Sequence, residues 1–150
     1  RAEESRRIGG LRDYFWKELR RLPVHSDRSF RHPERQRRIS GDSSSGTQND
    51  KAALQLNGSL ESRLPNNLNV YFPGHRAHEL QIKLDLAGVA ASPGAACRSG
   101  VAKASYVIAE MGFPMERAEG SLRFSLGRQT TKADVDFAVK QISAVAGRKK

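Results

Sequence analysis

Residues 92–100 (SPGAACRSG) contain the only cysteine of this 150-residue chain. A thiol is a strong nucleophile only as the thiolate, a form that neighbouring positive charge and access to solvent favour. Arg98 places a positive charge directly after Cys97, and Gly94 and Gly100 allow the backbone on either side to turn sharply or move. The pattern therefore suits a reactive thiol that collects a chemical group at one place and delivers it at another.

Another interpretation of Cys97 stays open at this point. Most free cysteines are small buried hydrophobic residues with no chemical role. Cysteine-protease chemistry would need an activating base, and His75 and His78 stand in no recognisable signature with Cys97. A single cysteine cannot form an internal disulfide, so nothing in the sequence points to an oxidising compartment.

Arg123 is the second residue whose position suggests chemistry. It lies in residues 121–126 (SLRFSL), where polar and apolar side chains alternate strictly, as in a half-buried strand. The alternation places Arg123 on the same face as Ser121 and Ser125. An arginine there is commonly a surface residue on the wet face of a sheet, but its planar guanidinium could instead bind a carboxylate through two parallel hydrogen bonds.

Helices are predicted where apolar residues recur every three or four positions. Residues 2–22 form one amphipathic stripe that Pro23 ends, with Trp16 off the stripe and expected to pack against something outside this chain. Further helices are predicted over residues 77–87, closed by Gly88, and over residues 103–111. A last helix starts at a capping-box-like pair, Thr131 and Asp134.

Short strands are predicted between these helices, at residues 53–56, 67–72, 89–92 and 121–126. The mixed order of strands and helices favours a small α+β domain, with a short sheet and helices packed on one side of it. We expect this domain to span residues 53–147, preceded by the helix at 1–22 and followed by a basic tail at 148–150.

Residues 23–52 separate the first helix from the predicted domain. They show no apolar period and are rich in Ser, Gly, Asp and Arg, so we expect a basic disordered insert or loop. His25 and His32 lie in this insert without a cysteine or a cluster of carboxylates at ligand spacing, and we therefore expect no metal site.

The chain carries a formal net charge of +10, which raises the question of a nucleic-acid partner. The excess is concentrated in residues 1–22, 28–38 and 148–150, a distribution more typical of solvated ends, so we do not expect nucleic-acid binding. No run approaches the roughly 20 apolar residues of a membrane helix, and no signal-peptide pattern opens the chain. We expect a soluble, cytoplasmic protein without membrane contact.

Four segments in series resemble the cysteine desulfurases, members of the class V aminotransferase family, and in particular the group that serves iron–sulfur cluster assembly. They are residues 63–74 (RLPNNLNVYFPG), 84–100 (LDLAGVAASPGAACRSG), 104–114 (ASYVIAEMGFP) and 118–136 (AEGSLRFSLGRQTTKADVD). The resemblance covers residues 52–147 and the helix at 2–22. It implies the small C-terminal domain of a fold-type I transferase that depends on pyridoxal 5'-phosphate (PLP).

The resemblance also implies a function. Such an enzyme converts L-cysteine to L-alanine and holds the sulfur as a persulfide, which it passes to a sulfur acceptor or iron–sulfur scaffold protein. Cys97 falls on the family's sulfur-carrying cysteine, Arg123 falls on the arginine that binds the substrate carboxylate, and the family is typically homodimeric. The residues that would support the mobile cysteine loop are Ser92, Gly94, Ala96 and Gly100.

The sequence departs from the family pattern in three ways. Ala95 replaces a serine of the family loop, and Pro93 precedes Gly94. The insert is longer than the family needs. No lysine follows a histidine, whereas the family holds PLP through a lysine in a His-Lys pair of its large domain.

The missing His-Lys pair leaves alternatives open. Because the chain also starts with Arg1 inside an apparent helix, we expect a fragment that has no PLP-binding lysine of its own and is inactive alone. Such a fragment could be a basic interaction module without catalysis. A related selenocysteine lyase is a further alternative.

Overall fold

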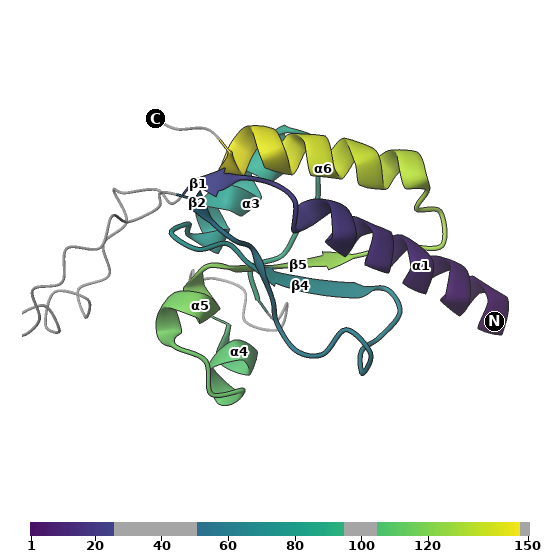
Figure 1. Ribbon diagram of the computed structural model, residues 1–150, viewed down its shortest axis with the longest axis horizontal. Helices are drawn as coiled ribbons and strands as arrows, with labels where there is room; N and C mark the ends of the chain where they lie inside the picture. The colour runs from purple at the N-terminus through teal and green to yellow at the C-terminus, as the bar shows by residue number, and fades with distance from the viewer. Residues whose placement is uncertain (26–50, 95–104, 148–150) are drawn as a thin grey trace, which may run out of the picture.

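The computed structural model describes residues 1–25, 51–94 and 105–147. Its centre is an antiparallel sheet in the order β3-β4-β5, formed by β3 (Gln55–Leu56), β4 (Asn67–Tyr71) and β5 (Ser121–Ser125). Three longer helices, α1 (Ala2–Leu19), α3 (Ala77–Leu86) and α6 (Lys132–Ala146), lie over one face of this sheet (Figure 1). The expected α+β class with a short sheet is confirmed, and the three long helices lie on one side of that sheet.

The register of β4 and β5 separates an apolar face from a polar face. Leu68 pairs with Phe124 and Val70 pairs with Leu122, and all four side chains are buried. Because side chains alternate along a strand, the residues next to these four point to the other face of the sheet. That face includes Asn67, Asn69, Ser121, Arg123 and Ser125, so Arg123 shares its face with both serines as the alternation predicts.

The apolar face and the three long helices share one hydrophobic core. Helix α1 runs beside α6 above the sheet (Figure 1), and the Phe15 ring on α1 meets the Phe124 ring of β5 edge-on at a centroid distance of 5.3 Å. Trp16 is partly buried against this core, so the expectation that it packs outside the chain is wrong. The indole reaches the core because the helix buries a wider face than a single stripe of apolar residues.

The helix ends follow the signals in the sequence. At the start of α6 the Thr131 hydroxyl accepts from the Asp134 N–H, and the Asp134 carboxylate accepts from the Thr131 N–H, which completes the predicted capping box. At the end of α3, Gly88 has φ +82°, its N–H donates to Asp85 O, and the Val89 N–H donates to Leu84 O. This is a Schellman motif, and it needs a left-handed residue that glycine supplies.

Three predicted elements differ in the structure. The helix predicted over residues 103–111 is the short α4 (Tyr106–Glu110), and a second short helix, α5 (Met115–Glu119), follows it. Of the strand predicted at residues 53–56, only β3 (Gln55–Leu56) pairs with another strand, β4. Residues 89–92 form no strand but a single bridge from Ser92 to β5. Five-residue helices are too short for a helical period to be visible in sequence, which is why α5 was not predicted.

The ends of the predicted insert are paired. Strand β1 (Val24–His25) is antiparallel to β2 (Lys51–Ala52), so residues at the two ends of the segment 23–52 lie side by side. Val24 is almost completely buried in the core, at 1% exposure, which explains why this end is fixed. His32 and residues 26–50 lie outside the described residues, and the predicted domain boundaries stay predictions.

Candidate functional site

Strand β5 presents Arg123 on the polar face of the sheet. The side chain is half-buried, and within the described parts of the chain its guanidinium has no hydrogen bond or ion pair. Its direct neighbour across the ladder is Asn69 of β4. A guanidinium left without a carboxylate partner on a polar face is suited to binding an anion from outside this part of the molecule.

Ser92 is held against Arg123 by the backbone. The Ser92 N–H donates to Arg123 O at 3.0 Å, and the Arg123 N–H donates to Ser92 O at 2.7 Å, which adds a single rung to the free edge of β5. The Ser92 hydroxyl also donates to Gly94 O at 3.0 Å. The structure therefore brings the first part of the predicted cysteine loop, Ser92 to Gly94, next to the predicted carboxylate-binding arginine.

The far end of the same segment is also attached near β5. The Ser105 N–H donates to Ala118 O at 3.4 Å, and Ser105 is buried at the start of α4. Ala118 lies in α5, which leads directly into β5. Cys97, Ala96 and Gly100, the remaining predicted loop residues, lie outside the described residues.

A buried polar cluster fixes α5 to the sheet, and it was not predicted. The Arg117 Nε donates to Asn57 Oδ1 at 2.6 Å, Nη1 donates to Gln55 Oε1 at 2.9 Å, and Nη2 donates to Leu56 O at 2.8 Å. The Asn57 amide donates in turn to Ser121 Oγ at 2.8 Å, and the Ser121 hydroxyl donates back to Arg117 O at 2.6 Å. The ring of hydrogen bonds satisfies two buried side chains, Asn57 and Ser121.

Aromatic rings cover the Arg117 guanidinium. It lies 3.9 Å from the centre of the Phe113 ring and 5.7 Å from the centre of the Tyr71 ring. Burial lowers the pKa of Arg117, and the nearby Tyr71 opposes this change. The side chain remains charged at any physiological pH, so it acts here as a permanent donor.

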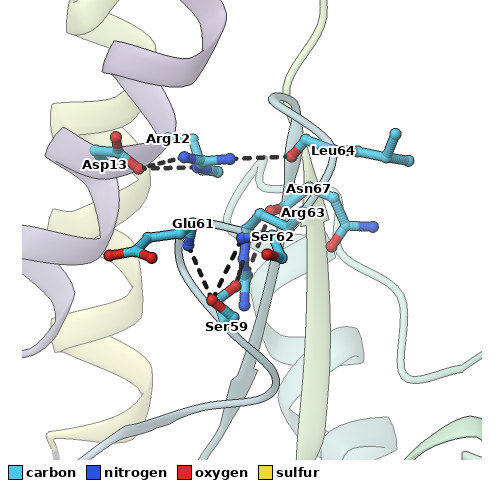
Figure 2. A network of polar contacts seen from close by, with 8 residues as sticks. All are labelled: Arg12, Asp13, Ser59, Glu61, Ser62, Arg63, Leu64 and Asn67. Atoms are coloured by element: carbon cyan, nitrogen blue, oxygen red, sulfur yellow. Dashed lines mark hydrogen bonds and ion pairs between the residues drawn. The ribbon is translucent and has the colours of Figure 1, made fainter.

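A second polar cluster joins α1 to the connection between β3 and β4 (Figure 2). Arg12 on α1 is buried and donates to Asp13 Oδ1 from Nε at 2.9 Å and from Nη2 at 2.7 Å, while its Nη1 donates to Leu64 O at 3.1 Å. Arg63 donates from Nε to Ser59 O at 2.6 Å. Its Nη2 donates to Asn57 O at 2.7 Å.

The charges in this second cluster are partly shielded from water. Burial lowers the pKa of Arg63 and the charge of Arg12 lowers it further, whereas Asp13 raises it. The Arg12 contact was not foreseeable in the sequence, because it joins residues 52 positions apart.

The comparisons with known proteins agree with the family resemblance. No family model matches the chain. A cysteine desulfurase IscS of Vibrio campbellii is 43% identical over 93 residues, 62% of this chain and 22% of that protein. Another cysteine desulfurase IscS, of Dictyoglomus turgidum, is 32% identical over 143 residues, 95% of this chain and 29% of that protein. Over most of its length the chain is similar to cysteine desulfurases.

Solved structures of NifS-like proteins share the fold of this chain. A NifS-like protein matches 97% of the chain and 29% of its own length with a TM-score of 0.66 at 22% identity. The NifS-like protein from Rickettsia africae matches 97% of the chain and 30% of its own length with a TM-score of 0.64 at 19% identity. The chain thus spans between a fifth and a third of the length of the cysteine desulfurases and NifS-like proteins that it matches.

The described lysines do not fit a PLP site. The four whose side chains are placed lie exposed on helices, and Lys132 is engaged with Tyr14 Oη at 2.9 Å and Asp136 Oδ2 at 2.8 Å. A lysine that forms a Schiff base is instead desolvated or held beside other charges that lower its pKa. None of the four is therefore suited to bind the cofactor: they are Lys17, Lys83, Lys132 and Lys140.

Within residues 1–25, 51–94 and 105–147, no three or more His, Cys, Asp or Glu side chains are grouped closely enough to bind a metal ion. None of the helices in the same residues is both long and apolar enough to cross a bilayer.

Proposed function

We propose that this chain is the part of a PLP-dependent cysteine desulfurase that carries the sulfur-accepting cysteine and binds the substrate carboxylate. In the whole enzyme L-cysteine would be converted to L-alanine, with Cys97 as the sulfur carrier and Arg123 as the carboxylate-binding residue. The proposal draws on the relatives named cysteine desulfurase and on the residue types at these two positions.

The pairing of Ser92 with Arg123 is the observation that carries the proposal. Cys97 follows Ser92 by five residues, and five residues of chain reach at most about 18 Å. The thiol is therefore tethered within reach of a substrate whose carboxylate is bound by Arg123.

The sulfur transfer that we propose is a nucleophilic substitution at the sulfur atom of the substrate. The Cys97 thiolate attacks the sulfur of L-cysteine, a new S–S bond forms, and the C–S bond of the substrate breaks. The electron pair of the broken bond stays on carbon. This carbon takes up the proton that the Cys97 thiol released, and it becomes the methyl group of L-alanine. An acceptor thiolate, on a scaffold or carrier protein, would then attack the outer sulfur of the Cys97 persulfide.

PLP would stabilise the charge on carbon when it is bound. Because the described lysines do not fit it, we assign the cofactor to the part of the enzyme that this chain does not cover. We also assign homodimer formation, expected from the family, to the whole enzyme.

The reactivity of Cys97 tests the carrier role. As the only cysteine, it can be followed by the mass that the intact chain gains from iodoacetamide at pH 7. We expect alkylation faster than that of glutathione under the same conditions, because a nearby cation and an accessible sulfur favour the thiolate. A thiol that reacts only after the chain is unfolded would identify Cys97 as a buried core residue and reject the proposal.

A transfer assay tests the same role in the enzyme. With this chain joined to a PLP-binding large domain, Cys97→Ser should abolish the persulfide detected by mass spectrometry. Ser99→Ala, a change in the same segment that leaves the thiol in place, is the matched control. Equal sulfur transfer by the Cys97→Ser variant would contradict the carrier assignment.

A further inference from the structure

The polar face of the sheet contains a chain of hydrogen bonds that starts at Arg117. An arginine has donors only, so the atom of Asn57 that accepts from Arg117 Nε at 2.6 Å must be the amide oxygen. The orientation of the Asn57 amide therefore follows from the donor-only chemistry of arginine. Its NH₂ group must point to the opposite side.

Asn57 passes this orientation on to Asn69. The Asn57 NH₂ donates to Asn69 Oδ1 and to Ser121 Oγ, each at 2.8 Å, which uses both of its hydrogens. Since the Asn69 oxygen is the acceptor, the other end of the Asn69 amide is its NH₂ group. Among the residues that the structure describes, that NH₂ group has no acceptor.

The free donor of Asn69 lies beside the unpaired guanidinium. Asn69 and Arg123 are direct partners across the β4–β5 ladder, and side chains at such positions share a face with Cβ atoms roughly 4.5–5.5 Å apart. Both side chains are half-buried. Two donor groups thus stand together, and neither has an acceptor within the described ranges.

We propose that Asn69 donates a hydrogen bond to the same amino-acid carboxylate that Arg123 binds, and that Asn57 is the positioning residue that turns the Asn69 amide outward. The inference rests on the proposed function, because it takes Arg123 as the carboxylate site. It adds a neutral donor, held by a buried hydrogen-bond chain, to that site. A planar carboxylate has about four acceptor positions, enough for a guanidinium and an amide together.

A structural role for Asn69 alone explains less of this arrangement. The ring from Arg117 through Asn57 and Ser121 already attaches α5 to the sheet without Asn69. Asn69 adds one acceptor to that ring and leaves its donor on the side of Arg123. Any apolar residue at this position would cost the ring one bond only, whereas the orientation of the donor matters only to a ligand.

The experiment is a titration of the ¹⁵N-labelled chain with L-alanine, followed by the side-chain NMR signals of Asn69 and Arg123. L-Alaninamide, which lacks the carboxylate, is the matched ligand control. We expect the Asn69 NH₂ and Arg123 Nε–H signals to shift together with L-alanine and to stay in place with L-alaninamide. The Asn57 NH₂ signals should stay in place with both ligands, because their hydrogens are already bonded.

Asn69→Asp is the decisive variant. Aspartate keeps an oxygen to accept from Asn57, so the hydrogen-bond chain and the fold remain, but it replaces the outward donor by a negative oxygen. We expect its apparent affinity for L-alanine to fall at least tenfold, as judged from the Arg123 signal. Asn67→Ala removes an asparagine of the same face that pairs with Ser125 instead, and it should bind as the unmodified chain does.

The outcomes separate the two proposals. If Arg123 responds to L-alanine but Asn69 does not, or if Asn69→Asp binds equally well, the role of Asn69 is wrong and the role of Arg123 stands. If neither signal responds to the carboxylate, the carboxylate site itself is contradicted, and with it the substrate-binding part of the proposed function.

Discussion

At the residue scale, Gly120 lies close to the end of β4 and the residues that follow it. A Cβ at this position would be 2.7 Å from Cε2 of Tyr71, 2.9 Å from His75 O and 3.1 Å from Phe72 O. The Phe72 N–H also donates to Gly120 O at 2.9 Å, so the two segments cannot separate without losing this bond. Only a residue without a side chain fits between α5 and β5 here.

We therefore expect Gly120→Ala to lower the free energy of unfolding by about 1–3 kcal/mol, the usual cost of overpacking. Gly10→Ala is the matched control, because a Cβ there meets nothing within 4 Å and Gly10 lies inside α1. That control should raise the free energy of unfolding by about 0.5–1 kcal/mol through helix propensity. Urea unfolding of both variants measures the difference, and equal effects would contradict the close approach at Gly120.

At the element scale, the start of α6 depends on an ionised carboxylate. The hydrogen bonds from the Thr131 N–H and hydroxyl hold the pKa of Asp134 below its ordinary value of 3.8. Because the ionised form is favoured in the folded state, the capping contribution is fully present above the ordinary pKa. It is lost as the pH falls through the lowered pKa of the folded state.

Asp134→Asn removes this dependence. We expect the variant to be less stable than the unmodified chain at pH 6, and the gap between their melting temperatures to close as the pH falls below 3.8. Thermal melts followed by circular dichroism between pH 2 and 6 measure the gap. Thr131→Ser keeps a hydroxyl cap and should keep the pH dependence, whereas a gap for Asp134→Asn that is constant with pH would contradict the capping role.

At the scale of the whole molecule, α1 is part of the core although residues 26–50 separate it from the sheet in sequence. Ile8, Phe15 and Leu19 are buried in the same cluster as the sheet residues, and Arg12 ties the helix to Leu64 (Figure 2). On the outer side, the Tyr14 hydroxyl of α1 donates to Asp136 of α6 at 2.6 Å. We infer that the helix and the sheet unfold together.

Two probes test this cooperativity. Trp16 is the only tryptophan and reports on α1, while far-ultraviolet circular dichroism reports on all elements. Their urea transitions should coincide, and Phe15→Ala should lower the free energy of unfolding by about 3–5 kcal/mol in both. The exposed Arg20→Ala should change it by less than about 0.5 kcal/mol. A tryptophan transition at lower urea than the circular dichroism transition would show that α1 is a separate unit.

Much of the local structure was predictable from sequence. The apolar period of α1, the alternation of β5, the capping box of α6 and the glycine after α3 all depend on residues within a few positions of each other. Each such signal reflects a local rule of backbone geometry or hydrogen bonding. The α+β class and the face of Arg123 follow from the same local patterns.

The arrangement around Arg123 depends on contacts between distant segments. Ser92 meets Arg123 across 31 positions, and Arg117 meets Asn57 across 60. In sequence Arg12 and Arg117 were visible only as charges. Which polar groups lose contact with water, and which partners then satisfy them, is decided when the sheet and helices pack. The sequence by itself determined the three longer helices, the two longer strands and the two chemically distinctive residues, Cys97 and Arg123. The tertiary structure alone decided which polar residues lie next to Arg123, because Asn69 and Ser92 come from segments far from it in the sequence.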